Sequence, residues 1–349
     1  MHANKMLCSR IKAPPKTKRI ILTRPENIMR QLSLLTALFL LSSSGAVLAQ
    51  ESGPSSNRAN PLIEKHEDGQ AIFGLYAPAN RPANRNPQNL PNKSQPELAS
   101  ETLGVKNSDF LFNGSMESSI EQALPVWSEY VEAMVEAGAT IRTHPTIVKA
   151  PKIADDYEAA THNIARQLDT GVAEIMFVTV ESAQEVEHGL RAMRYQSNGG
   201  LRPDDSVGNA PVYWGMSDEE YIEKADLWPI NPEGELINWT VVESPKGLEN
   251  VREIAAVDGI GVLWPGAGTL RQLFSTQNAQ GERVTDEAAW ENAIQQVLAA
   301  CKEFDVPCGF PATTNDIEMR MEQGFSVFVM AWGENGFATI DMGKRAARD

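Results

Sequence analysis

An acidic residue stands where an apolar run gives way to a helical pattern. The run "LINWTVV" (236–242) is followed directly by Glu243, and the helical pattern starts at Ser244. A carboxylate on an apolar rim must be paired, bound to a metal or shifted in its pKa. Glu243 is therefore a candidate metal ligand. The alternative is an acid that interacts only with the dipole of the following helix.

A lysine ends a second apolar run, "TIVKA" (146–150), at position 149. Lys149 could hold a carboxylate or an enolate oxygen through its positive charge. If it is desolvated, it could instead act as a Schiff-base nucleophile, and nearby Lys152 is a second candidate for that role. The remaining alternative is a lysine on the rim of the site that pairs with Glu181 or Glu243.

A second acid, Glu117, closes the motif "NGSME" after the apolar run 110–114. A carboxylate at this place could be a second metal ligand or a general base. It could also be an acid that caps the helix expected to begin near Ser119. The residue types alone leave these three roles open.

The segment "PGAGTL" (265–270) contains Gly266, Ala267, Gly268 and Thr269. Consecutive backbone N–H groups near the start of a helix can bind an anion such as a carboxylate. The segment lacks the Lys and Ser/Thr arrangement of a P-loop, so it does not predict nucleotide binding. A tight structural turn is the alternative.

Short apolar runs alternate with helical patterns along the chain, and these elements must position the candidate side chains. Most runs are apolar on both faces, as parallel strands covered by helices are. Two intervening helices have clear starts, at Ser182 with Glu185 three residues later and at Ser244 with Pro245. Eight such units predict a (β/α)8 TIM barrel, with a doubly wound open sheet as the alternative. The expected strands are 71–76, 110–114, 146–150, 174–180, 236–242, 259–264, 307–312 and 325–331.

The barrel prediction gives the candidate residues a common location. In barrel enzymes the active site lies at the carboxyl ends of the strands. Glu117, Lys149, Glu243 and the segment 265–269 all follow expected strands, so we expect them at one mouth. Arg142 precedes a strand and is expected at the opposite end, where residues serve stability.

Residues 1–49 are expected to be a targeting signal. Downstream of Met29 lies "LSLLTALFLLSSSGAVLA", which is too short for a membrane span and ends in small residues typical of a cleavage site. We predict a true start at Met29, cleavage before Gln50 and a periplasmic or secreted protein. Residues 50–100 form an N-terminal extension that contains the first strand, and residues 101–349 form the remainder of a single barrel domain.

Removal of the signal leaves a strongly acidic chain. Residues 1–49 hold eight of the 31 Lys and Arg residues and one of the 46 acids, so residues 50–349 carry a net charge of −22. Such a surface repels nucleic acid and anionic lipid, and we expect neither nucleic acid nor, after cleavage, a membrane as a partner. Cys301 and Cys308 remain, and export permits a disulfide between them, with two buried thiols as the alternative.

Long stretches of the chain resemble one known family. They are "AIFGLY", "FLFNGSME", "GVAEIMFVTVESAQEVEHGLRAMRY", "KADLWPINPEGELINWTVVESPKGLENVREIAAVDGIGVLWPGAGTL" and "VPCGFPATTNDIEMRMEQGFSVFVMAW". They are similar to the HpcH/HpaI aldolase/citrate lyase superfamily of barrel enzymes. The resemblance implies a TIM barrel of the phosphoenolpyruvate/pyruvate-domain type, a last helix that is often exchanged between subunits, and a homo-oligomer such as a trimer or hexamer.

The resemblance also implies roles for individual residues. In the metal-dependent members a divalent metal held by a Glu and an Asp binds the keto acid, an Arg steadies the enolate and a His takes part in proton transfer. Carried over, the metal Glu falls on Glu243 and the Arg on Lys149. The metal Asp falls on Thr269 and the His on Met116, so this chain departs from the family pattern there. Glu117 could replace either missing group.

These observations lead to one main functional hypothesis. It is an aldolase-like carbon–carbon lyase of the aldehyde-lyase type that acts on a small anionic hydroxy- or oxo-acid through a pyruvate-type enolate. The expected cofactor is Mg²⁺, Mn²⁺ or Co²⁺ bound at Glu243, with Lys149 and Glu117 catalytic and residues 266–269 binding substrate. The alternatives are a Schiff-base lysine aldolase and a non-catalytic periplasmic barrel that binds small acids.

Overall fold

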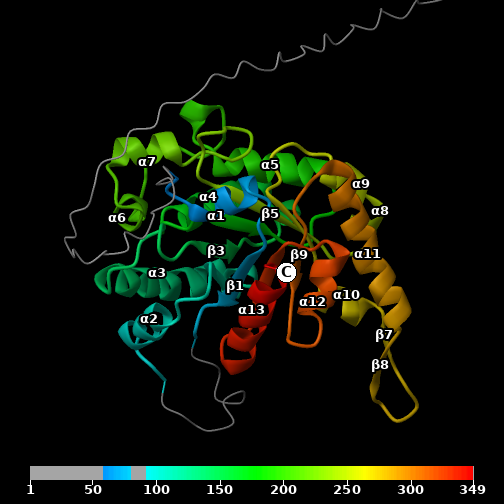
Figure 1. Ribbon diagram of the computed structural model, residues 1–349. Coiled ribbons are helices and arrows are strands. Elements are labelled where there is room, and N and C mark those ends of the chain that lie inside the picture. The colour runs from blue at the N-terminus through cyan, green and yellow to red at the C-terminus, as the bar shows by residue number, and fades with distance from the viewer. Residues whose placement is uncertain (1–57, 80–91, 349) are drawn as a thin grey trace, which may run out of the picture. The chain divides into compact units, whose positions relative to one another are not determined.

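Eight parallel strands with helices between them form a ring in the computed structural model, which describes residues 58–79 and 92–348 (Figure 1). The strands are hydrogen-bonded in the order β6-β5-β4-β3-β2-β1-β10-β9, and a parallel bridge between Leu263 and Cys308 closes the ring. The predicted (β/α)8 TIM barrel is therefore confirmed. The expected signal, residues 1–49, lies outside the described residues.

All eight apolar runs form strands of the ring. The main difference from the prediction is the fourth strand, which was expected to reach residue 180 and ends at Phe177. The ring strands are β1 (Ile72–Tyr76), β2 (Phe110–Asn113), β3 (Thr146–Lys149), β4 (Glu174–Phe177), β5 (Ile237–Val242), β6 (Val262–Pro265), β9 (Gly309–Pro311) and β10 (Val327–Met330). A separate antiparallel hairpin consists of β7 (Ser275–Gln277) and β8 (Arg283–Thr285).

The two helix starts that the sequence marked, at Ser182 and Ser244, are confirmed. Ser182 accepts a hydrogen bond from the N–H of Glu185, and Ser244 accepts one from the N–H of Gly247. The helices of the N-terminal half are α1 (Pro61–Glu67), α2 (Gln95–Gly104), α3 (Ile120–Glu136), α4 (Tyr157–Leu168), α5 (Ala183–Met193), α6 (Ala210–Trp214) and α7 (Asp218–Lys224). Those of the C-terminal half are α8 (Pro245–Glu249), α9 (Val251–Ala255), α10 (Ala267–Leu273), α11 (Glu287–Phe304), α12 (Ile317–Gln323) and α13 (Glu334–Ala346).

Two apolar cores hold the barrel together. One lies between the strands and the surrounding helices, and the last helix, α13, contributes to it by packing on β1 and β10 of the same chain. The other fills the ring itself with side chains such as Phe110, Trp239 and Trp264. The indole of Trp264 comes so close to Gly309 that a Cβ there would lie 2.1 Å from it. The interior is therefore a packed core. No helix within the described ranges is long and apolar enough to cross a membrane.

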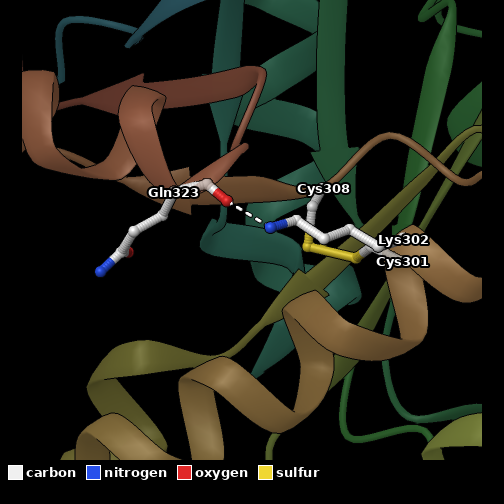
Figure 2. The surroundings of a disulfide bond; sticks show 4 residues. All are labelled: Cys301, Lys302, Cys308 and Gln323. Atoms are coloured by element: carbon white, nitrogen blue, oxygen red, sulfur yellow. Dashed lines mark hydrogen bonds between the residues drawn. A yellow bond between two sulfur atoms is a disulfide. The ribbon is translucent and has the colours of Figure 1, made fainter.

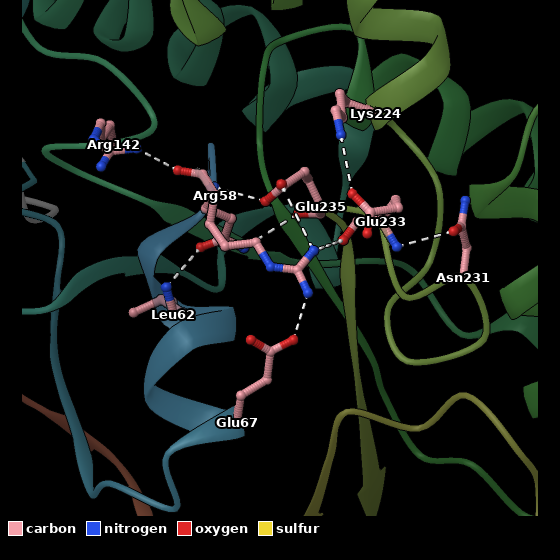
Figure 3. A network of polar contacts seen from close by, with 10 residues as sticks. Arg58, Leu62, Glu67, Arg142, Lys224, Asn231, Glu233 and Glu235 are labelled. Carbon is pink, nitrogen blue, oxygen red and sulfur yellow. Dashed lines mark hydrogen bonds and ion pairs between the residues drawn. The ribbon is translucent and has the colours of Figure 1, made fainter. Parts of the chain in front are cut away.

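Helix α1 closes the amino-terminal end of the barrel, and its Leu62 and Ile63 belong to the interior core. The backbone N–H of Asn60 donates to a carboxylate oxygen of Glu235 at 2.9 Å. Figure 3 shows Arg58 reaching from this segment toward both Glu67 and Glu235. Arg142 donates to the carbonyl of Arg58, so Arg142 lies at the stability end of the barrel, as expected.

A fully buried acid, Glu174, lies inside the barrel at the start of β4. Its Oε2 accepts a hydrogen bond from the indole N–H of Trp239, while its Oε1 has no partner among the described residues. Burial raises the pKa of Glu174 from 4.5 to about 8, and hydrogen bonds with Trp239 and Asn60 oppose that rise only in part. An ionised carboxylate is unfavourable there because low-polarity surroundings replace water.

A disulfide joins Cys301 on α11 to Cys308, which immediately precedes β9 (Figure 2). The two Cα atoms are 5.7 Å apart, within the usual range for a disulfide. Both residues are buried. Next to the disulfide, Lys302 donates to the carbonyl of Gln323 at 2.6 Å. Of the two possibilities that the sequence left open for these cysteines, the structure has the disulfide.

Removing this disulfide is expected to lower the free energy of unfolding by about 2–3 kcal/mol, since the cross-link restricts the unfolded chain over a short loop. The double variant Cys301→Ser/Cys308→Ser should therefore unfold at a lower urea concentration than the oxidised wild type. Reduced wild type serves as the control and should match the variant. Coincident urea curves for oxidised wild type and the double variant would contradict the expectation.

Candidate active site

A cavity of about 220 Å³ lies at the carboxyl end of the barrel. Every strand of the ring contributes a residue to its wall, so the cavity lies on the barrel axis. Glu243 and the segment 266–269 complete the wall. The residues from the strands, in ring order, are Tyr76, Phe112, Lys149, Met176, Val241, Trp264, Pro311 and Val329.

Glu243 follows β5 directly, and only 5% of the residue is exposed. Its Oε1 accepts two hydrogen bonds from Thr179, one from the backbone N–H at 3.1 Å and one from the hydroxyl at 2.8 Å. Among the described residues no hydrogen bond reaches Oε2. A Cβ on Gly266 would lie 2.4 Å from Oε2, so only glycine leaves the carboxylate in this place. Thr179 thus fixes Oε1 of Glu243, and Oε2 is available to contact a ligand.

The hydrogen bonds do not support the alternative in which Glu243 interacts only with the start of the following helix. Helix α8 is capped by Ser244, whose hydroxyl accepts from the N–H of Gly247 at 3.0 Å. The bonded oxygen of Glu243 is directed to Thr179 instead. The carboxylate is therefore held by the neighbouring strand end rather than by the helix start.

The backbone of Thr179 is unusual for a β-branched residue, because its φ is 49°. This left-handed region costs about 1–2 kcal/mol for a residue with a Cβ. Such strain persists where the surrounding structure fixes it, and it concentrates at functional sites. The bonds to Glu243 are the polar contacts that hold Thr179 in place.

Lys149 ends β3 and forms an ion pair with Glu117, with Nζ and Oε2 2.7 Å apart. Both side chains are partly buried, at 19% and 35% exposure. The carbonyl of Lys149 accepts from the side chain of Gln167 at 2.8 Å, which fixes the strand end. Burial raises the pKa of Tyr76; the Lys149 charge opposes that rise and the Glu117 charge adds to it. The charges of Lys149 and Glu117 therefore both act on the Tyr76 phenol.

The sequence left Glu181 and Glu243 as possible partners of Lys149. Neither of them is its observed partner, which is Glu117. Glu181 instead pairs with Lys152 at 3.4 Å and accepts a hydrogen bond from Ser244 at 2.7 Å. The Ser244 hydroxyl, followed by the Lys152 charge, holds the pKa of Glu181 below its usual value. This second pair lies beside the cavity and is not part of its wall.

The glycine-containing segment is not a free loop. Gly266 precedes α10, and residues 267–269 form its first turn. The N–H of Gly266 donates to the carbonyl of Val242 at 3.0 Å, as part of the ladder between β6 and β5. The wall that this segment gives to the cavity carries no side chain larger than that of Thr269, so it leaves room beside Glu243.

The mouth offers a metal few ligands. Within the described ranges, no three His, Cys, Asp or Glu side chains are placed to hold a metal ion together. The available donors are Oε2 of Glu243 and the nearby hydroxyl of Thr269. Mg²⁺ commonly keeps several waters and uses one or two carboxylates together with substrate oxygens. The residues therefore fit a metal that binds together with an oxo-acid, and not a preformed metal cage.

A larger hollow of about 740 Å³ lies outside the barrel, between α4 and residues 201–206. Its two arginines already have partners, since Arg166 pairs with Glu121 and Arg202 pairs with Asp169. It also lies away from the carboxyl ends of the strands, where the axial cavity brings Lys149 and Glu243 together. The mouth of the barrel is therefore the stronger candidate.

The structure brings most of the predicted residues together. Lys149, Glu243 and the segment 266–269 line one cavity, and Glu117 joins them through Lys149. Thr179, which holds Glu243, was not among the predicted residues. Its local sequence, "FVTVES", reads as an uninterrupted strand end, so no local signal marks it.

Comparison with known proteins agrees with this geometry. The sequence profile of the HpcH/HpaI aldolase/citrate lyase family matches residues 132–341. A hydroxypyruvate/pyruvate aldolase of Paraburkholderia phytofirmans is 26% identical over 283 residues, which is 79% of this chain and 92% of that protein.

Solved structures share the fold. An HpcH/HpaI aldolase/citrate lyase family protein of Burkholderia cenocepacia superposes with a TM-score of 0.59 at 20% identity, covering 83% of this chain and 98% of that one. An HpcH/HpaI aldolase of Desulfitobacterium hafniense gives a TM-score of 0.54 at 17% identity, with 77% and 89% covered. From the profile match over residues 132–341, together with the shared barrel fold, this chain belongs to the HpcH/HpaI aldolase/citrate lyase family.

Proposed function

We propose that this protein is a carbon–carbon lyase that cleaves a small anionic 4-hydroxy-2-oxo acid to a pyruvate-type acid and an aldehyde. The observation that carries the proposal is the axial cavity, where Glu243 and Lys149 lie in one wall. A buried carboxylate and a cation around one small space suit a substrate that becomes an enolate. The family relationship, and the relative named hydroxypyruvate/pyruvate aldolase, support the same class of reaction.

The chain's own residues divide the work of a retro-aldol cleavage. Glu117 accepts the proton of the 4-hydroxyl group. The C3–C4 bond then breaks, the aldehyde leaves, and the electron pair becomes the enolate of the oxo-acid. The Lys149 ammonium, held by Glu117 at 2.7 Å, stabilises the enolate oxygen. Protonation at C3 by the group that took the hydroxyl proton completes the cycle.

Glu243 would hold the divalent metal, Mg²⁺, Mn²⁺ or Co²⁺, through Oε2. When bound, such a metal polarises the carbonyl of the oxo-acid as a Lewis acid. Residues 266–269 contact the substrate in this proposal, because they leave the open side of the cavity next to Glu243. Because the site has a single protein carboxylate, we expect it to bind the metal alone weakly and to bind it more tightly when an oxo-acid is present.

The test is an assay of pyruvate or hydroxypyruvate release from a panel of 4-hydroxy-2-oxo acids with Mg²⁺, Mn²⁺ or Co²⁺ added. Lys149→Met should lower kcat by about 10²–10³-fold, the usual effect of removing one group that stabilises an oxyanion. Lys149→Arg should keep most of the activity because the cation remains. Absence of release from every substrate with every metal would refute the proposal.

Lys152→Met is the matched control for this series. Lys152 also follows β3 and also pairs with an acid, but it does not line the cavity. We expect its kcat to stay near that of the wild type. An equal loss in both lysine variants would indicate a general charge effect rather than a role of Lys149.

Two alternatives give different results in the same experiments. An ion pair uses the ammonium form of Lys149, whereas a Schiff base needs the neutral amine, so the geometry favours the metal-dependent version. Borohydride trapping with pyruvate followed by peptide mass analysis would detect a Schiff base at Lys149 or Lys152. Stabilisation by an oxo-acid in a thermal-shift assay, without metal dependence or turnover, would instead identify a non-catalytic barrel that binds small acids.

We further propose that the protein is exported to the periplasm or the medium and acts as a homo-oligomer. The signal-like residues 1–49 support export, and so does the buried disulfide, since such bonds persist in oxidising compartments. Sequencing of the exported protein should give Gln50 as the first residue. Light scattering of that product measures its oligomeric state, and a monomer would refute the second part.

A further inference from the structure

The segment that continues from β4, the neighbour of β5 in the ring, has one extra residue next to Glu243. Alternate residues of β4 bond to β5, beginning with the carbonyl of Ala173, which accepts from the N–H of Ile237. A regular ladder would continue so that the N–H of Thr179 donates to the carbonyl of Val241. Instead the N–H of Val180 donates to Val241, at 3.0 Å. Thr179 is therefore the additional residue of a β-bulge.

The bulge frees the polar groups of Thr179 from the sheet. Its backbone N–H, no longer needed by the ladder, turns to Oε1 of Glu243 at 3.1 Å, and its hydroxyl reaches the same oxygen at 2.8 Å. The left-handed φ of 49° is the backbone conformation that allows both donors to converge. Bulges next to active sites commonly redirect side chains in this way.

We propose that Thr179 is a positioning residue for Glu243, which rests on the proposed function of Glu243 as the metal ligand. A carboxylate oxygen has two lone-pair directions, and Thr179 occupies both on Oε1. The remaining oxygen, Oε2, is then presented toward the cavity in a single orientation between the strand end and Gly266. Groups that orient a metal ligand in this manner often change metal affinity by 10–100-fold.

Three substitutions separate the hydroxyl from the backbone conformation. Thr179→Ser keeps the hydroxyl, Thr179→Ala removes it but keeps a Cβ in the left-handed region, and Thr179→Gly removes it while adopting that region freely. Mn²⁺ affinity is measured by electron paramagnetic resonance with oxalate present, because oxalate resembles the planar enolate of pyruvate. The alanine and glycine variants should bind Mn²⁺ about 10–100-fold more weakly, and the serine variant within about threefold of wild type.

Thermal unfolding in EDTA shows whether an effect is only structural. If Thr179 served only the fold, the variants would lose thermal stability, but the folded variants would bind Mn²⁺ as tightly as the wild type. That result would overturn the proposal. The glycine variant is the sharpest case, because it has no steric reason to unfold and still lacks the hydroxyl. Recovery of affinity in the serine variant assigns the effect to the hydroxyl.

Glu243→Gln distinguishes failure of this inference from failure of the proposed function. If wild type binds Mn²⁺ with oxalate, Glu243→Gln does not, and all three Thr179 variants bind like wild type, the positioning role is refuted and the metal site stands. If wild type itself shows no Mn²⁺ binding with oxalate, the metal site and the positioning role are refuted together.

Discussion

Glu243→Gln is expected to abolish Mn²⁺ binding in the presence of oxalate and to lower metal-dependent release of the oxo-acid by about 10³-fold or more. A metal that polarises a carbonyl contributes several kcal/mol to the transition state, and each 1.36 kcal/mol corresponds to a factor of ten in rate. The substitution changes little else. A glutamine carbonyl can still accept the two hydrogen bonds from Thr179, so the fold around the site should remain.

The matched control is Glu181→Gln. Glu181 also follows a strand of the ring at the mouth, but it pairs with Lys152 and Ser244 rather than lining the cavity. Its loss should leave Mn²⁺ affinity within about threefold of wild type, since it orients no metal ligand. If Glu243→Gln retained metal-dependent turnover, or if both variants lost it equally, Glu243 would not be the ligand.

The second large effect concerns stability and pH. Glu174 has a pKa of about 8 in the folded chain against an ordinary value of 4.5. The folded state therefore keeps a proton that the unfolded state releases, so the contribution of Glu174 to stability is greatest below pH 4.5 and falls as the pH rises to about 8. For this one group the loss amounts to about 3–5 kcal/mol. Glu174→Gln, which stays neutral, should remove that loss.

Urea unfolding at intervals between pH 5 and pH 9 measures this difference. The wild type and Glu174→Gln should be similar near pH 5, and the variant should be the more stable of the two at pH 8.5. Glu303→Gln, at an exposed acid on α11 that pairs with Arg252, serves as the control and should keep the wild-type pH dependence. Parallel pH profiles for wild type and Glu174→Gln would show that Glu174 does not titrate in this range.

The ring of strands could be predicted because each strand is a short apolar run with a helix start behind it, as at Ser182 and Ser244. Helices α1 and α2 could not be predicted in the same way. Helix α1 buries only Leu62 and Ile63, too few for a periodic pattern, and its reason to form is the open end of the barrel that it covers. That reason becomes visible only when distant strands are in place.

Part of the candidate site could also be predicted from the sequence, and part could not. Glu243 and Lys149 were predictable because parallel strands bring their carboxyl ends to one mouth, and both residues follow strands. The pairing of Lys149 with Glu117 rather than with Glu181 depends on how the turn after β2 is oriented. The bulge at Thr179 depends on the register between β4 and β5, which no single segment encodes.

The ring of strands closes between β6 and β9, and this closure bears on aggregation. These two strands meet through one bridge, at Leu263 and Cys308, so this seam is where the ring has its fewest backbone bonds. An opened seam would expose two sheet edges, and exposed edges recruit strands from other molecules. The disulfide anchors Cys308 to α11 beside this seam. By holding the start of β9 beside α11, the disulfide opposes the exposure of these two edges.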